Sequence, residues 1–197
     1  MNSLKTIPLF PSGQTHSYHV NARNWIREHR GIYRLADFPA AERPDLMLWY
    51  LWSQNRREIS EGIYSHETAL SLHELSDIMP SKLHMTVPKN FRRNSTIPQI
   101  LILHRADVDK SDVQEVYGVR VTRPLRTIID LLRTKQVDES QLKLAVNEAL
   151  RLGLIGTREI EHTSPECGGR SSPRSGLTRT SYSHKYIRQI HSSCAPR

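Results

Sequence analysis

The stretch NWIREHRGIYRL, residues 24–35, decides how the N-terminal part of this chain is interpreted. Gly31 stands between two short segments in which apolar and polar residues alternate, a pattern that predicts a β-hairpin. We expect one strand to start at Trp25, a turn over residues 28–31 and a returning strand over residues 32–35. Two interpretations are open. The hairpin lies on nucleic acid, or it is an ordinary sheet edge whose arginines face water and prevent pairing with other chains.

Basic and aromatic side chains are concentrated in and just before this hairpin. Guanidinium groups bind phosphate oxygens, and phosphate contacts fix the position of a protein on DNA without reading its sequence. The candidate DNA-contacting residues are Arg23, Trp25, Arg27, His29, Arg30, Tyr33 and Arg34.

The positive charge of the chain lies mainly at its two ends. The 197 residues carry a formal net charge of +8, to which residues 1–36 contribute +4 and residues 163–197 contribute +5. The residues between these two segments contribute −1. Clustered positive charge attracts polyanions such as nucleic acids, although it also serves solubility alone. The last 35 residues are rich in Ser, Arg and Gly, a composition that predicts a disordered tail.

Between the hairpin and the tail, the sequence predicts a mixed α/β body that follows a linker at residues 39–44. Apolar residues at helical spacing predict helices at residues 44–52, 65–75, 122–132 and 138–152. Runs of β-branched and aliphatic residues predict strands at residues 82–88, 99–105 and 116–122. Residues 1–13 show no periodicity and are expected to be loose.

Several residues suit the ends of these helices. Pro44 fits a first helical position, and Ser65, Thr122 and Asp138 are placed to cap the three helices that follow. The run LMLWYLW at residues 46–52 is apolar on every side, so its helix should be deeply buried. That run is far shorter than the ~20 residues that cross a bilayer, so we expect no membrane span.

A search for catalytic patterns finds none that identifies an enzyme. The phosphate-binding G-x-x-x-x-G-K-[ST], the zinc-binding H-E-x-x-H and the nucleophile-bearing G-x-S-x-G patterns are missing from the sequence. None of the lysines has an acidic residue two positions before it, which counts against a metal-dependent nuclease. We therefore expect no enzymatic activity and no cofactor.

Three histidines have to be considered as metal ligands. His66 and His73 lie seven residues apart on one expected helix, and His84 follows on a strand; imidazole is a common zinc ligand. No cysteine or carboxylate completes a recognised spacing, and Cys167 and Cys194 match no metal or disulfide pattern. We therefore expect no metal and interpret these histidines as partly buried side chains that are hydrogen-bonded to the backbone.

Asp130 follows Arg126 by four residues on an expected helix, a spacing that favours an ion pair across one helical turn. A catalytic role for Asp130 would need a partner acid or base, and the sequence identifies none. We therefore predict a structural role.

Four stretches of the chain occur in the order seen in the AbiEi family of bacterial antitoxins. They are residues 24–39, 63–77, 83–93 and 117–132. Over about residues 14–160 the chain resembles these proteins. The positions that match the family pattern, with no role assigned, are Ser65, His66, Thr122, Arg126, Thr127 and Asp130.

The resemblance implies an α+β protein with three parts. Residues 1–38 would be a remnant winged helix-turn-helix whose wing is the hairpin at about residues 24–35. Residues 44–162 would be an AbiEi-like α/β antitoxin domain, and residues 163–197 an atypical basic tail. Only about 24 residues precede Trp25. We therefore expect a shortened recognition helix and impaired reading of DNA sequence.

The resemblance also implies a function. The chain would be a cytoplasmic antitoxin of a type IV toxin–antitoxin system that counters a nucleotidyltransferase-like toxin without forming a stable complex with it. It would also repress its own operon by binding double-stranded promoter DNA. Two alternatives stay open: a nuclease-related protein or accessory that processes nucleic acid, and a nonfunctional fragment whose body does not fold stably.

Overall fold

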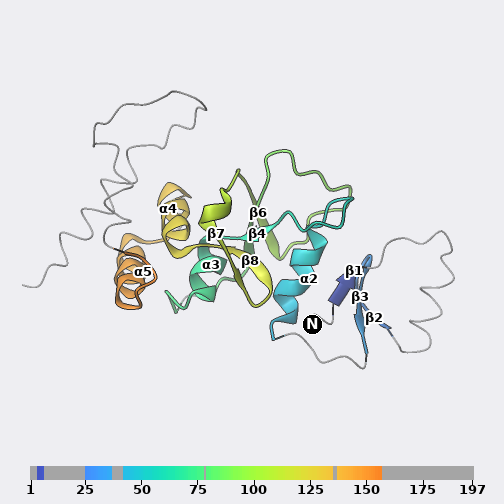
Figure 1. Ribbon diagram of the computed structural model, residues 1–197, viewed down its shortest axis with the longest axis horizontal. Coiled ribbons are helices and arrows are strands. Elements are labelled where there is room, and N and C mark those ends of the chain that lie inside the picture. Colours follow the sequence, from blue (N-terminus) through green and yellow to red (C-terminus); the bar gives the residue numbers. More distant parts are fainter. Residues whose placement is uncertain (1–3, 7–24, 37–41, 78, 135–136, 157–197) are drawn as a thin grey trace, which may run out of the picture. The chain divides into compact units, whose positions relative to one another are not determined.

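A computed structural model gives the structure of the protein (Figure 1). The residues that it describes are 4–6, 25–36, 42–77, 79–134 and 137–156. Within these ranges the protein combines α-helices with two β-sheets, so the expected α+β class is confirmed. The predicted tail, both cysteines and Arg23 lie outside the described residues. Among the described helices, none combines the length and the apolar character that a bilayer crossing requires.

The chain forms two compact units, and each is made of two separate segments. Unit 1 comprises Met1–Ser65 and Ser81–Thr122, and unit 2 comprises His66–Pro80 and Arg123–Arg197. Both sheets belong to unit 1. The predicted domain boundaries, at residues 38–44 and 162–163, stay predictions.

The first sheet of unit 1 contains the predicted hairpin. Strands β2 (Trp25–His29) and β3 (Ile32–Leu35) pair antiparallel around the turn at Arg30 and Gly31. Gly31 has a φ of +79°, a backbone conformation that glycine adopts without strain. The hairpin is confirmed, but its turn is tighter than expected, because β2 continues through His29 after a register shift that follows Arg27.

A third strand, β1 (Leu4–Thr6), pairs antiparallel with β3, so the order of this sheet is β1-β3-β2. The prediction that residues 1–13 are loose is therefore wrong for these three residues. The reason is that a strand this short leaves no periodic signal, and it forms because β3 offers an unpaired edge.

The second sheet of unit 1 has five strands in the order β6-β5-β4-β8-β7. Its strands are β4 (Ile63–Tyr64), β5 (Leu83–Val87), β6 (Leu101–Arg105), β7 (Val113–Val116) and β8 (Val119–Thr122). The sheet is mixed, because β5 runs parallel to β6 and β4 runs parallel to β8, whereas β4–β5 and β7–β8 are antiparallel. A short 3₁₀ turn, η1 (Lys110–Asp112), leads into β7.

The strand expected over residues 116–122 is instead a hairpin, so that prediction was wrong in part. Val116 faces Val119 across a turn formed by Tyr117 and Gly118, whose φ angles are 51° and 75°. Positive φ at both central residues is typical of the tight turn whose twist suits a β-hairpin. The chain therefore reverses at Tyr117-Gly118 and does not continue as one strand.

Helix α2 (Pro44–Trp52) begins at the predicted proline and packs against β1, β3 and β8. Leu46, Met47 and Trp52 are fully buried, while residues 48–51 are only half-buried. The expectation of a deeply buried helix is thus correct for part of its length. Tyr64 of β4 donates a hydrogen bond of 2.6 Å from its hydroxyl to the carbonyl of Leu46, which ties α2 to the five-stranded sheet.

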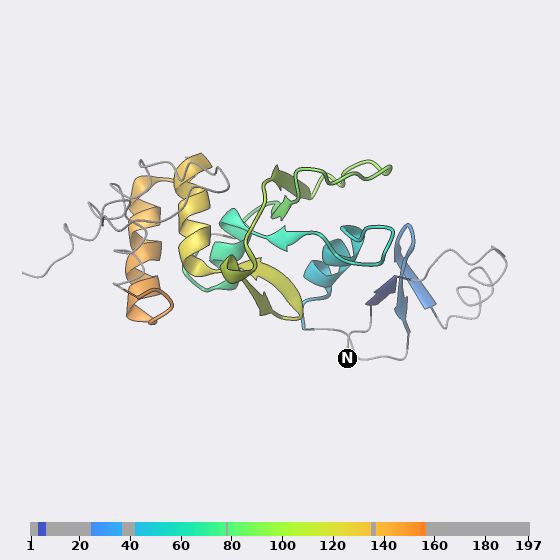
Figure 2. The same cartoon turned by 45° about the horizontal axis from the view of Figure 1, so that its top comes forward.

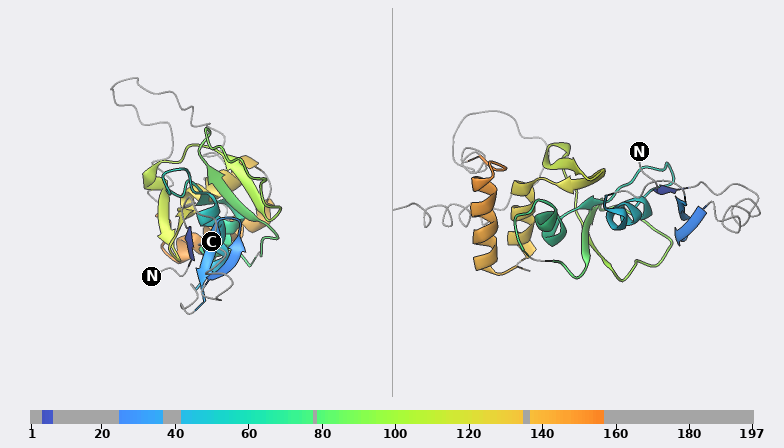
Figure 3. Two further views of the ribbon diagram at one scale, coloured as in Figure 1. Left: turned by 90° about the vertical axis from the view of Figure 1, so that its right-hand side faces the viewer. Right: turned by 90° about the horizontal axis from the view of Figure 1, so that it is seen from below.

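The described part of unit 2 contains α3 (His66–Leu72), α4 (Pro124–Thr134) and α5 (Glu139–Arg151), and α4 and α5 lie side by side (Figures 2 and 3). Asp138 occupies the predicted N-cap position of α5, but its side chain makes no capping hydrogen bond. Gly153, with a φ of +67°, follows the C-cap residue Leu152. Thr122 was expected to cap α4, which is wrong, because Thr122 is the last residue of β8 and the helix starts at Pro124.

One apolar cluster holds unit 2 together. Residues of α3, α4 and α5 meet in it, as their helical spacing predicts. Its buried members are Leu70, Leu75, Ile128, Leu131, Leu142, Ala145, Val146, Ala149 and Ile155.

Gly62 supplies the first prediction, because a side chain has no room there. A Cβ atom at Gly62 would overlap Sδ of the fully buried Met85 and would lie 2.9 Å from Oγ of Ser53. We expect G62A to lower the free energy of unfolding by about 1–3 kcal/mol, the range found for overpacked cores. Urea denaturation of the wild type and the variant would measure it.

The double-mutant cycle with M85A tests the cause. Because M85A removes the overlapping sulfur, the penalty of G62A should shrink in that background. An equal penalty in both backgrounds would show that Met85 is not the obstacle.

Candidate functional site

The predicted DNA-contacting residues are divided between the two faces of the β2–β3 hairpin. In the register, Arg27 lies opposite Tyr33 and Ile26 lies opposite Arg34, and residues directly opposite each other share a face. Arg27 therefore shares its face with Tyr33 and Trp25, whose rings lie 5.9 Å apart. Arg34 points to the other face.

These basic side chains also differ in how available they are. Arg27 and Arg30 are exposed. Arg34 donates from Nε to Oε1 of Glu28 at 2.8 Å, so an internal carboxylate already offsets its charge. His29 packs its ring against Trp49 at 5.4 Å, and its Nδ1 is buried without a hydrogen-bond partner. Among the described candidates, Arg27 and Arg30 are therefore the cations best placed to contact a polyanion.

A second candidate lies on one face of the five-stranded sheet. Thr86 of β5 pairs in register with His104 of β6, and its hydroxyl donates to Oγ of Ser65 at 2.7 Å. His84 lies two residues before Thr86 on the same face of β5, and its carbonyl accepts the backbone N–H of Ser65 at 3.1 Å. Ser65, His84 and Thr86 are buried, so this is a polar cluster inside the protein.

The two histidines of this face are in direct contact. Nδ1 of His84 lies 3.1 Å from Nε2 of His104, and the ring planes are inclined by 21° with centroids 5.2 Å apart. The two rings are therefore nearly parallel and touch through one nitrogen each. One nitrogen must carry a proton and the other a lone pair. Burial lowers the pKa of His84 below its ordinary value of 6.5.

A third histidine, His66, directly follows Ser65 in the chain. His66 belongs to unit 2, whereas His84 and His104 belong to unit 1. His66 and His73 were grouped with His84 from their spacing, but within unit 1 the imidazole that contacts His84 is that of His104. The sequence signal that could have found His104 is the parallel pairing of the predicted strands at residues 82–88 and 99–105, which brings it beside β5.

The family-pattern residues on α4 form the predicted ion pair. Nε of Arg126 lies 3.0 Å from both carboxylate oxygens of Asp130, and the two side chains are 15% and 9% exposed. The hydroxyl of Thr127 donates to the carbonyl of Arg123 at 3.0 Å. Arg133 approaches Asp130 from the next turn at 3.8 Å.

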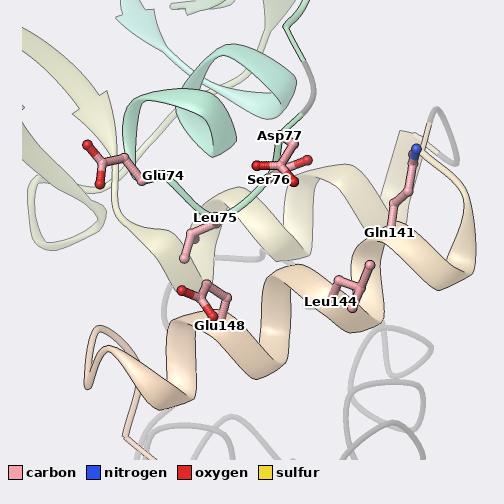
Figure 4. A pocket seen from close by; sticks show the side chains of 7 residues that line it. All are labelled: Glu74, Leu75, Ser76, Asp77, Gln141, Leu144 and Glu148. Atoms are coloured by element: carbon pink, nitrogen blue, oxygen red, sulfur yellow. The ribbon is translucent and has the colours of Figure 1, made fainter.

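A hollow on unit 2 is a third candidate and is lined by the segment after α3 and by α5 (Figure 4). Its lining residues are Glu74, Leu75, Ser76, Asp77, Gln141, Leu144 and Glu148. Glu148 is engaged at 2.9 Å with Nε of Arg151, which holds the pKa of that carboxyl below its usual range. The hollow is acidic and open, and it suits neither phosphate nor a buried ligand.

No protein-family model matches the chain, and no curated protein matches it either. The sites described above therefore carry the functional argument.

The Arg126–Asp130 pair supplies the second prediction. Since both side chains are mostly buried, removing one partner leaves the other charge poorly solvated. We expect R126A and D130A each to lower the free energy of unfolding by about 2–4 kcal/mol, and the double variant to lose less than the two losses added together.

The matched control is R133A, which removes the more distant and half-exposed arginine and should cost under about 0.5 kcal/mol. Chemical denaturation measures all four variants. Strict additivity of R126A and D130A would contradict a coupled pair.

Protonation of His84 should make the stability of the folded protein depend on pH. Because burial lowers the pKa of His84 in the folded protein, the unfolded chain binds more protons there as the pH falls below 6.5. The contribution of His84 to stability should be constant above that pH, fall as the pH drops toward the folded-state pKa of His84, and level off below it. A second proton on the pair would also place two N–H groups face to face.

Thermal melts of the wild type and of H84N between about pH 8 and about pH 5 would test this linkage. H84N should flatten the decline in melting temperature across that range. An unchanged pH profile in H84N would assign the acid sensitivity to other groups.

Proposed function

We propose that this chain is an antitoxin-like, DNA-binding transcriptional regulator, as its resemblance to the AbiEi antitoxins implies. The observation that carries the proposal is the three-stranded antiparallel sheet near the N-terminus, whose hairpin exposes Arg27 and Arg30. A two-stranded hairpin with exposed guanidinium groups at and beside its turn is suited to the phosphates that line a DNA groove.

The order of this sheet supports a wing. Because β1 pairs with β3, β2 is the outer strand of the sheet, and the turn at Arg30 and Gly31 connects it to the central strand. In a winged helix-turn-helix protein the recognition helix reads base edges while neighbouring segments hold the backbone. The segment that would carry such a helix, residues 7–24, lies outside the described residues.

We extend the proposal to the antitoxin role. The chain would counter a nucleotidyltransferase-like toxin without forming a stable complex with it, and would repress the operon that encodes both. Co-expression of this chain with a nucleotidyltransferase encoded beside it should restore the growth that the toxin arrests. If growth arrest persists on co-expression, the antitoxin role is refuted, while the DNA-binding role is unaffected.

Replacement of Arg27 and Arg30 tests whether the hairpin contacts DNA phosphates. Because each lost phosphate contact removes about 0.9 from the slope of log affinity against log salt, R27A/R30A should weaken binding to duplex DNA and flatten that slope by about 2. A fluorescence-anisotropy titration at several salt concentrations measures both quantities. The thermal melt should stay almost unchanged, since both side chains are exposed.

The matched control is R56A/R57A, which removes two other exposed arginines of unit 1. It should retain most of the affinity and of the slope. Equal losses in both double variants would reduce the effect to net charge and return the hairpin to a solvated sheet edge.

Comparison of the chain's own upstream DNA with a scrambled duplex separates two modes of binding. Equal affinity for both duplexes would identify a protein that holds phosphates only, as a shortened reading element implies. Tighter binding to the native duplex would show that base reading is intact.

A further inference from the structure

The hollow on unit 2 is an acidic surface that the DNA-binding proposal does not use (Figure 4). Three carboxylates line it, those of Glu74, Asp77 and Glu148. Glu148 already pairs with Arg151. Glu74 and Asp77 are exposed, and within the described part of the chain no hydrogen bond or ion pair engages their carboxylates. The hollow therefore presents two negative charges that no described cation offsets.

An exposed apolar stripe of α5 crosses the same hollow. Gln141, Leu144 and Glu148 line it, and with the C-cap residue Leu152 they recur at intervals of three and four residues, so the four share one helix face. Leu144 is 67% exposed and Leu152 is 44% exposed. The opposite face of α5 is buried in the apolar cluster of unit 2. The stripe is thus apolar surface beside acidic groups, outside the core.

The end of α3 fixes the backbone from which Glu74 projects. The N–H of Leu75 donates to the carbonyl of Leu70 and the N–H of Glu74 donates to that of Ser71, each at 3.1 Å. These two bonds form a Schellman ending, whose residue in the left-handed conformation is usually glycine or asparagine. Here that residue is Glu74, with a φ of 57°. An asparagine at this position would therefore remove the charge and suit the backbone.

These features define the kind of partner that the hollow fits. Nucleic acid carries the wrong charge for it. A symmetric dimer through this face would place its carboxylates against the same carboxylates of the second copy, which repel each other. The occupant should instead be a basic segment with apolar side chains at helical spacing, which could cover the stripe and neutralise the acidic groups at once.

A segment of the same chain has both properties. Residues 182–191, with the sequence YSHKYIRQIH, lie outside the described residues. Tyr182, Tyr186 and Ile190 recur every four residues, a spacing that would bring them to one face of a helix. Lys185 and Arg188 would lie on the opposite side of that helix. Segments with this pattern can fold when they bind a groove.

The length of the intervening chain permits the contact. Tyr182 follows Gly156, the last described residue, by 26 positions. A flexible chain of that length spans about 25–30 Å on average. Helix α5 has 13 residues and is therefore about 20 Å long. A tether of this length would hold the segment near the hollow at an effective concentration on the order of millimolar.

We propose that residues 182–191 dock into the acidic hollow of unit 2. The two basic side chains of the segment face Glu74 and Asp77, and its apolar side chains cover Leu144. A docked segment withdraws part of the positive charge of the tail from polyanions. The contact involves no residue of the β2–β3 hairpin, so failure of this proposal or of the DNA-binding proposal leaves the other unaffected.

A spin label on a native thiol tests the contact in the full chain. C167S leaves Cys194, three residues after the segment, as the single site for the label. Paramagnetic broadening of NMR signals falls steeply with distance. The amide signals of the residues that line the hollow should therefore broaden more than those of the five-stranded sheet of unit 1. Absence of selective broadening at the hollow would overturn the proposal.

Removal of the two carboxylates tests the role of charge. E74N/D77N should abolish most of the selective broadening, because the basic side chains of the segment lose their partners. The matched control is D109N/E115Q, which replaces two exposed carboxylates of unit 1 and should leave the broadening unchanged. Equal effects of both double variants would reduce the attraction to net charge and overturn the proposal.

Reversal of the charges tests whether the two sides meet. E74K/D77K should abolish the selective broadening, and addition of K185E/R188E to that chain should restore it. Because all four residues are changed without truncation, the fold of unit 2 is checked in each variant by the same spectra. Failure of the fourfold variant to restore the broadening would refute a direct contact between segment and hollow.

A mixed sample separates docking within one chain from docking between chains. An isotope-labelled chain without the spin label is combined with a spin-labelled chain of natural isotope content. Docking within one chain predicts no broadening of the hollow in this mixture. Broadening as strong as in the singly labelled sample would show that the segment occupies the hollow of a second copy, and would overturn the proposal.

Discussion

The two-residue strand β4 connects the two halves of the five-stranded sheet, and the integrity of unit 1 depends on it. Ile63 and Tyr64 pair with β5 on one side, and Tyr64 pairs with Val121 of β8 on the other, so without β4 the sheet would fall into two separate pairs of strands. Tyr64 is fully buried, and its hydroxyl reaches the carbonyl of Leu46 in α2. Desolvation raises the pKa of that hydroxyl, so it stays protonated and remains a donor. Gly62 sits immediately before β4 because no larger residue fits beside Met85.

The same strand positions the polar cluster. Residues of a strand alternate between faces, so the chain that places Tyr64 on the apolar side places Ser65 on the opposite side, where Thr86 donates to it. Buried polar groups are costly unless they are hydrogen-bonded. The hydroxyls of Ser65 and Thr86 form one pair on this face, and the imidazoles of His84 and His104 form another. Packing on the apolar face of the sheet fixes the backbone and so fixes the positions of both pairs. Such pre-positioned groups suit a ligand, because their ordering is completed during folding.

Local signals in the sequence predicted the elements whose ends are chemically marked. Pro44 marks the start of α2 and Gly31 marks the hairpin turn, since each acts through its own backbone preference. Asp138 occupies the N-cap position of α5, but its side chain makes no capping hydrogen bond. β4 was missed because two residues cannot show a period. His104 was missed as a partner of His84 because parallel pairing depends on the topology of the sheet, which no local pattern encodes.

The two candidate sites differ in the electrostatics on which they rely. Arg27 and Arg30 lie in high-dielectric solvent, where added salt would screen the attraction for phosphate that we propose over about a Debye length. His84 is buried and His104 is half-buried, so screening is weaker there, and protonation decides whether a ring nitrogen donates or accepts a hydrogen bond. Ionic strength would therefore govern phosphate binding at the hairpin, and pH would govern the protonation of the His84–His104 pair. Because the two variables act on different residues, a salt titration at fixed pH and a pH titration at fixed salt would report on the two sites separately.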